Sequence, residues 1–214
     1  MLKKVAGILV AFGLVSVTAE SQQADSLFLP RDGIVFSLQT FAPLSDDMQE
    51  TYGFIPSLGV RAMFESARQI SIVCGGSFLY KAGEFYSSWG PMLRGEPTRL
   101  RAALGEFGLR MSSIPRAKRN VFMEGGVSLA WAGERFREAD TEIFEKEHSG
   151  TGMGLWLGGG TERFVRESLS WGLQGRVSLC SVTARYDRYP DYWPSSYSID
   201  LSGVWISVFL GLYR

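Results

Sequence analysis

A single histidine is the main candidate for general-base chemistry in this chain of 214 residues. His148 is followed directly by Ser149, and three glutamates precede it within the segment EIFEKEHS, 142–149. A histidine that takes a proton from a serine hydroxyl, with a carboxylate to orient it, is the arrangement of nucleophilic hydrolysis. Adjacent residues in a polar segment seldom face each other with that geometry. We therefore interpret this segment as a solvated loop or a short helical excursion.

The chain has too few ligands for the common metal centres. One His and two Cys cannot supply a multi-histidine site or a four-thiolate zinc site. The two cysteines, Cys74 and Cys180, cannot form a disulfide scaffold either. The glycine run 158–160 lacks the Lys-Ser/Thr that completes a phosphate-binding loop. We expect no metal, no cofactor and no enzymatic activity.

Composition excludes further classes of protein. The 22 Lys+Arg and 22 Asp+Glu balance, so the basic excess of a nucleic-acid-binding protein is missing. The length fits one domain. The chain also combines 25 glycines with 14 Phe, 8 Tyr and 6 Trp. Glycine and aromatic residues enriched together are unusual for a soluble α/β enzyme.

Residues 1–19 have the pattern of a secretory signal peptide. Lys3 and Lys4 precede an uncharged stretch over 5–17, and small residues end at Ala19. The uncharged stretch is shorter than the roughly 20 residues that a membrane-spanning helix needs. We predict cleavage near Ala19, export of the mature protein, and a single domain over residues 20–214.

Eight segments of the exported part alternate apolar residues with small, polar or charged ones at a period of two, which predicts β-strands. They cover residues 34–41, 57–65, 70–80, 99–111, 121–131, 153–162, 169–179 and 199–213. The last segment is apolar on both faces, so the facing of its side chains stays open. Three short connections alternate with four long ones. This order predicts eight antiparallel strands with both chain ends on the short-turn side.

The pattern predicts an all-β fold, an eight-stranded antiparallel up-and-down transmembrane β-barrel with a polar interior. Outer-membrane barrels have short periplasmic turns and long outer loops. A soluble lipocalin-like barrel also has eight strands, but its apolar residues face inward. Charges at mid-strand favour the membrane barrel, since they could pair across a narrow lumen. These residues are Arg61, Glu106, Arg110, Glu124, Glu162 and Arg176.

The same alternation predicts which face of the barrel wall other side chains occupy. We expect Cys74 to face lipid and Cys180 to face the lumen, so that the two thiols stay unbonded. We also expect aromatic residues near the strand ends to form girdles at the membrane interfaces. These are Phe41, Tyr80, Trp131, Trp171 and Tyr213.

Three stretches resemble the outer-membrane β-barrel domain superfamily, whose small members are OmpA- and OmpX-type. They are VFMEGGVSL (121–129), the hairpin that joins GGGTERF (158–164) to LSWGLQGRV (169–177), and LSGV (201–204). The resemblance covers roughly residues 30–214. It implies that Glu124, Glu162 and Arg176 point into the barrel. It also implies a terminal aromatic residue read by the barrel assembly machinery, whereas this chain ends in Tyr213-Arg214.

The predicted function is that of an integral outer-membrane protein with a structural or surface-interaction role. An eight-stranded barrel is just wide enough for side chains to fill it, so we expect the six mid-strand charges to pair and plug the lumen. Aromatic residues of two long loops are expected to contact a surface ligand, or else to extend the interfacial aromatic belt or order the loops by packing on each other. These are Tyr86, Trp89, Tyr189, Tyr192 and Trp193.

Two other functions stay open. One is a small channel that passes ions or small apolar molecules through the wall or the lumen. The other is a lipid-modifying barrel enzyme centred on His148. The expected partners are outer-membrane lipid and lipopolysaccharide, the barrel assembly machinery and a surface ligand, with no nucleic acid among them.

Overall fold

The computed structural model describes residues 32–67, 69–85, 96–113, 119–136, 148–185 and 196–214. The strands are β1 (Gly33–Pro43), β2 (Ile55–Ala67), β3 (Ile70–Phe85), β4 (Glu96–Ser112), β5 (Arg119–Phe136), β6 (His148–Arg166), β7 (Leu169–Arg185), β8 (Ser196–Asp200) and β9 (Gly203–Tyr213). One short helix, α2 (Asp46–Tyr52), joins β1 to β2. Within these ranges no helix is long and apolar enough to cross a bilayer. The predicted signal peptide lies outside the described residues.

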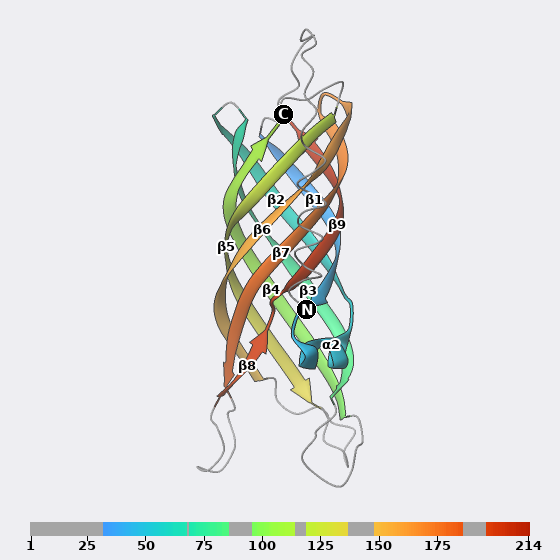
Figure 1. Ribbon diagram of the computed structural model, residues 1–214, viewed down its shortest axis with the longest axis vertical. Helices are drawn as coiled ribbons and strands as arrows, with labels where there is room; N and C mark the ends of the chain where they lie inside the picture. The colour runs from blue at the N-terminus through green and yellow to red at the C-terminus, as the bar shows by residue number, and fades with distance from the viewer. Residues whose placement is uncertain (1–31, 68, 86–95, 114–118, 137–147, 186–195) are drawn as a thin grey trace.

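The strands form a closed antiparallel barrel (Figure 1). Strands β1 to β7 pair in chain order, and β9 closes the wall by pairing with both β7 and β1. β8 and β9 follow one another along β7, so together they make the eighth barrel strand. The interruption falls at Leu201 and Ser202, where the backbone N–H of Leu201 donates to the carbonyl of Cys180 at 2.8 Å. This topology confirms the predicted all-β, eight-stranded up-and-down barrel.

The outer surface of the barrel is apolar. Its projecting side chains are large and exposed, for example Leu58 (65%), Leu129 (65%) and Met153 (76%). The last strand, whose facing the sequence left open, also turns its aliphatic residues outward, from Ile206 to Leu212. Apolar side chains outside and charged ones inside are the reverse of a soluble barrel. We call this outer surface the lipid-facing band.

The predicted aromatic girdles are only partly correct. Tyr80, Trp131 and Trp171 face outward and are exposed. Phe41 and Tyr213 face inward and are buried, so the prediction was wrong for them. Both occupy inward positions in the alternation of their strands. The Phe41 ring packs 4.6 Å, centroid to centroid, from an inward tryptophan ring.

The middle strands are longer than the alternating segments. β3 to β7 contain 16 to 19 residues, whereas about 9–11 suffice to cross a bilayer. Beyond the lipid-facing band the strands need no apolar outer face, and antiparallel pairing there still satisfies their backbone N–H and C=O groups. As a result, Glu134 and His148 belong to β5 and β6 and lie directly opposite each other. The prediction of a loop or helical excursion over 142–149 was wrong for His148 and Ser149, which begin β6, while residues 142–147 lie outside the described residues.

The interior is layered along the barrel axis. An apolar layer lies toward the long loops and a second, more aromatic layer lies toward the short turns. The first includes Leu79, Leu100, Leu104, Val182 and Ile199; the second includes Val73, Phe122, Phe164 and Phe209. Charged side chains are concentrated between them and beside the second layer. The interior is less polar than predicted, because side chains fill so narrow a barrel and packed apolar groups need no water.

A helix replaces strand in one part of the wall near the long loops. β3 continues to Phe85, but its part from Tyr80 pairs with β4 alone within the described residues. β8 likewise pairs with β7 alone there. Helix α2 packs against β3 and buries Met48 and Tyr52 (Figure 1). Gly83 permits the approach, because a Cβ at that position would lie 2.7 Å from a ring carbon of Tyr52.

Candidate functional site

Four of the six predicted lumen charges form one network of ion pairs, which we call the central network. Arg61 on β2 donates from Nη1 to Glu124 Oε1 on β5 at 2.6 Å, and its Nη2 lies 3.1 Å from Glu106 Oε2 on β4. Arg176 on β7 pairs with the other oxygen of Glu106. All four side chains are at most 7% exposed. Two positive and two negative groups balance, which limits the cost of burying them.

Glycines between the charged strands give these side chains room. In the sheet register Gly75 lies between Arg61 and Glu106, and Gly158 lies between Glu124 and Arg176. A Cβ at residue 75 would lie 2.6 Å from Arg61 Cα and 2.8 Å from Arg61 Cγ. The small inward residues therefore provide the space that the long charged side chains occupy.

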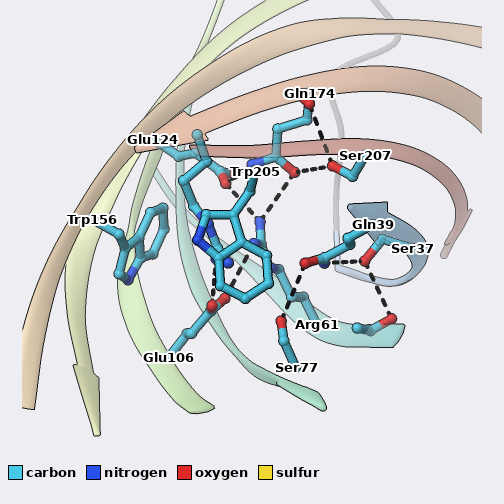
Figure 2. Close-up of polar contacts among 12 residues, drawn as sticks. Ser37, Gln39, Arg61, Ser77, Glu106, Glu124, Trp156, Gln174, Trp205 and Ser207 are labelled. Carbon is cyan, nitrogen blue, oxygen red and sulfur yellow. Dashed lines mark hydrogen bonds and ion pairs between the residues drawn. The ribbon is translucent and has the colours of Figure 1, made fainter. Parts of the chain in front are cut away.

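Two tryptophans flank the arginines of the central network (Figure 2). The guanidinium carbon of Arg61 lies 5.5 Å from the centroid of the Trp156 ring, and that of Arg176 lies 4.5 Å from the Trp205 ring. Both distances fit cation–π attraction. The indole N–H of Trp205 donates to Ser178 Oγ at 2.8 Å. The indole rings thus contact the faces of the guanidinium groups, while the carboxylates accept from guanidinium N–H groups.

Neutral polar side chains extend the network toward β1 and β9 (Figure 2). The amide of Gln174 donates to Glu124, and its Oε1 accepts from Arg61 Nη1 at 3.3 Å and from Ser207 Oγ at 3.5 Å. On the β1 side a second set of hydrogen bonds joins Ser37, Gln39 and Ser77. Polar contacts therefore reach around most of the barrel circumference at this level.

The other two predicted charges form a separate pair nearer the short turns. Arg110 Nη2 lies 2.5 Å from Glu162 Oε2, and its guanidinium carbon lies 3.6 Å from the centroid of the Phe122 ring. Ser170 Oγ donates to Glu162 Oε1 at 2.5 Å, and the hydroxyl of Tyr213 donates to the same oxygen. Within the described residues, no ion pair joins this group to the central network.

Sequence reasoning missed a polar cluster at the long-loop end. The hydroxyl of Tyr52 donates to Glu134 Oε1 at 2.8 Å and lies 3.0 Å from Thr98 Oγ1. Burial raises the pKa of Tyr52, and the nearby charge of Glu134 raises it further. The hydroxyl therefore stays protonated and acts as a donor. A signal was available, because Glu134 continues the inward alternation through Ala130 and Ala132.

The structure does not assemble the proposed histidine–serine arrangement. His148 is 6% exposed and faces the interior opposite Glu134. Ser149 is the next residue of the same strand, so its side chain points to the opposite face. Two groups on opposite faces of one strand do not lie within hydrogen-bond reach, as proton transfer requires.

The remaining predicted residues fall into two groups. Cys180 is buried and inward-facing and Cys74 is on the outward face, and both are free thiols, as predicted. The five predicted loop contacts lie outside the described residues: Tyr86, Trp89, Tyr189, Tyr192 and Trp193.

Two interior residues that sequence reasoning did not select are Trp156 and Trp205. Trp156 had a signal, as the single large inward residue among the glycines of β6.

Known structures share the fold of this chain, but not its sequence. No protein-family model and no curated protein sequence matches it. The outer membrane protein OprG from Pseudomonas aeruginosa superposes with a TM-score of 0.59 at 9% identity, over 88% of this chain and 99% of OprG. A major outer membrane protein from Thermus thermophilus gives 0.52 at 12% identity, over 85% of this chain and 99% of the other. The chain therefore has the fold of small outer-membrane β-barrels, as its resemblance to them implied.

Proposed function

We propose that this protein is an integral outer-membrane barrel with a closed lumen and a structural or surface-interaction role. The observation that carries the proposal is the central network, which joins β2, β4, β5 and β7 across the interior by buried ion pairs. Apolar layers on both sides of it support closure. A lumen filled in this way leaves the outer wall and the long loops as the surfaces that meet other molecules.

Residence in the outer membrane is supported by the lipid-facing band and by the shared fold. The partners in this proposal are the surrounding lipid, including lipopolysaccharide, and the machinery that inserts barrels. Cell fractionation followed by electrophoresis with and without boiling tests it. We expect the protein in the outer-membrane fraction and a change of mobility on heating. An unchanged mobility would count against a closed, detergent-stable barrel.

Planar-bilayer recording tests the closed lumen. We expect no steady conductance of porin size from the wild-type protein. The double variant Glu106→Ala/Arg176→Ala removes one charge of each sign from the central network and should raise the conductance. Glu65→Ala/Arg119→Ala makes the same change at two exposed positions and is the control. Steady conductance by the wild type would overturn the proposal of a plug.

The surface-interaction role rests on the aromatic residues of two predicted long loops, 83–97 and 187–196. Amphipathic aromatic side chains are common at binding surfaces. A cell-surface binding assay with both loops shortened tests this role, with heat-dependent mobility as the check on folding. A variant that is folded and still binds as the wild type does would remove the loops from the proposal.

A second candidate function is the passage of small apolar molecules between the lumen and the membrane. The observation that favours it is the apolar inner layer next to the part of the wall where α2 replaces strand. Replacement of residues 46–52 by a glycine-serine linker should then increase uptake of a small apolar dye by vesicles that contain the protein. Equal uptake by the variant and the wild type would reject this candidate.

We do not assign a catalytic role to His148. Its inward, buried position opposite Glu134 supports a structural role within the loop-end polar cluster. His148→Ala should therefore leave lipid A species in the membrane unchanged. A shift in those species on substitution would favour the enzyme alternative.

A further inference from the structure

The outer wall carries arginines in directly opposed pairs at both ends of the lipid-facing band. Near the long loops Arg99 on β4 faces Arg135 on β5, and near the short turns Arg119 on β5 faces Arg163 on β6. All four belong to the outward alternation of their strands. Like charges directly opposite across two strands repel each other. Such pairs are stabilised when an anion lies between them.

At the long-loop end a third arginine joins the pair. Arg101 is two residues from Arg99 on the same face of β4, and its guanidinium carbon lies 5.8 Å from the ring centroid of Tyr80. Arg101 is diagonal to Arg135 in the register, which places the two Cα atoms roughly 7–8 Å apart. We call Arg99, Arg101 and Arg135 the outer arginine triad. Glu84 on β3 is diagonal to Arg99, and these four described residues together carry a net formal charge of +2.

The height of the arginines matches the headgroup regions of a bilayer. Arg119 and Arg135 are 16 positions apart on β5 (135 minus 119). At about 3.4 Å per residue and a tilt of about 40°, their levels differ by about 40 Å along the membrane normal. A bilayer is about 40–45 Å thick with its headgroups and about 30 Å without them. The outward residues of β5 between the two arginines carry no charge.

We propose that the outer arginine triad binds a phosphate group of lipid A, the phosphorylated glycolipid of the outer leaflet. Guanidinium groups donate paired hydrogen bonds to phosphate oxygens, and the phosphate charge offsets the repulsion between Arg99 and Arg135. The long loops mark the outer side of the barrel, which puts the triad in the leaflet that holds lipid A. Tyr80, directly opposite Arg101, and Trp131 are exposed on the outer wall and supply an apolar surface for the sugar and acyl chains. The inference rests on the proposed outer-membrane residence.

Titration of the purified full-length protein in detergent with diphosphoryl lipid A, followed by native mass spectrometry, tests the site. The triple variant R99Q/R101Q/R135Q should bind at least about tenfold more weakly, because several charge-assisted hydrogen bonds are lost. R99K/R101K/R135K keeps the charge without the paired geometry and should give an intermediate loss. R163Q removes one outward arginine at the other end and should change the affinity less than twofold. Lipid A without phosphates should bind the wild type as weakly as diphosphoryl lipid A binds the triple variant.

Three results would overturn the site: an unchanged affinity of the triple glutamine variant, an equal loss in R163Q, or equal binding of lipid A without phosphates. Displacement by millimolar inorganic phosphate would instead indicate a site for free phosphate and would equally reject the lipid assignment. Each variant is first checked for the heat-dependent mobility of a folded barrel. Failure of the wild type to fractionate with the outer membrane would reject the proposed function, whereas a membrane-resident wild type that ignores lipid A would reject the site alone.

Discussion

Glu106 is the residue on which the central network depends, because its two oxygens hold two different arginines. Glu106→Gln removes one of two negative charges and leaves two buried guanidinium groups with one carboxylate. Loss of one partner from a buried ion pair costs about 3–5 kcal/mol. We expect a loss of that size in the free energy of unfolding by urea in lipid vesicles. Glu65→Gln, at an exposed position, should change it by less than about 0.5 kcal/mol. A comparable stability of the two variants would contradict the network.

At Gly75 the addition of a single methyl group is expected to lower the free energy of unfolding. Gly75→Ala would place Cβ 2.6 Å from Arg61 Cα, so the strands or the arginine must shift. We expect a loss of about 1–3 kcal/mol, as for overpacked cores. Gly105→Ala is the matched control, because the nearest atom to its added Cβ is 3.9 Å away. Urea unfolding of both variants checks the difference, and equal stabilities would show that the interior yields at residue 75.

The facing of most side chains could be predicted from the sequence, but their partners could not. Strict alternation placed Arg61, Glu106 and Arg176 inside, because lipid accepts only the apolar face of such a strand. The rule that large aromatic residues belong to interfacial girdles failed for Phe41 and Tyr213, which fill the interior. The alternation would have placed Phe41 inside, whereas the last strand, apolar on both faces, gave no such signal for Tyr213. It could not show that Arg110 bonds to Glu162 rather than to Glu124, its direct neighbour in the register.

Helix α2 is tied to the opposite part of the wall through the side chain of one residue. Tyr52 is its last residue and bonds to Thr98 and Glu134 on two other strands. Tyr52→Phe leaves a buried carboxylate without this donor, which costs about 1–3 kcal/mol. We expect amide hydrogens of residues 46–52 to exchange at least about tenfold faster in the variant. Tyr80→Phe, on the outer wall, should leave that exchange unchanged; if the two variants behave alike, Tyr52 does not anchor the helix.

Strand order and turn positions were predictable, whereas strand ends and the helix were not. Short and long connections alternate in the sequence because each hairpin returns to the same side of the membrane. Pairing beyond the lipid-facing band has no hydrophobic signature, so the sequence predicted a loop or helical excursion at His148 instead of a strand. Helix α2 is seven residues long, too short for a clear helical period. Only Ser45 followed by Asp46 and Asp47 marks its start.

For the molecule as a whole, the surfaces are inverted relative to a soluble protein. The outside is an apolar band bounded by arginines, and the inside holds balanced charges between two apolar layers. Closure follows from the pairing of β1 with β9, which joins residues far apart in the sequence. Such a register depends on the tilt of the strands around the barrel, which no local pattern encodes. The charged side chains of the central network therefore find their ion-pair partners only when the barrel is closed.

This inverted arrangement predicts opposite responses of two tryptophans to lipid. Trp171 faces outward and is 41% exposed, whereas Trp205 faces the central network and is 2% exposed. In vesicles made with brominated acyl chains, a variant that keeps only Trp171 should lose most of its fluorescence, since bromine quenches on contact. A variant that keeps only Trp205 should lose little, because the wall separates its ring from the lipid. Both variants lack Trp156, and the first also lacks Trp205, so each is checked for the heat-dependent mobility of a folded barrel before its quenching is measured. Equal quenching of the two would mean that the barrel wall does not separate its interior from the bilayer.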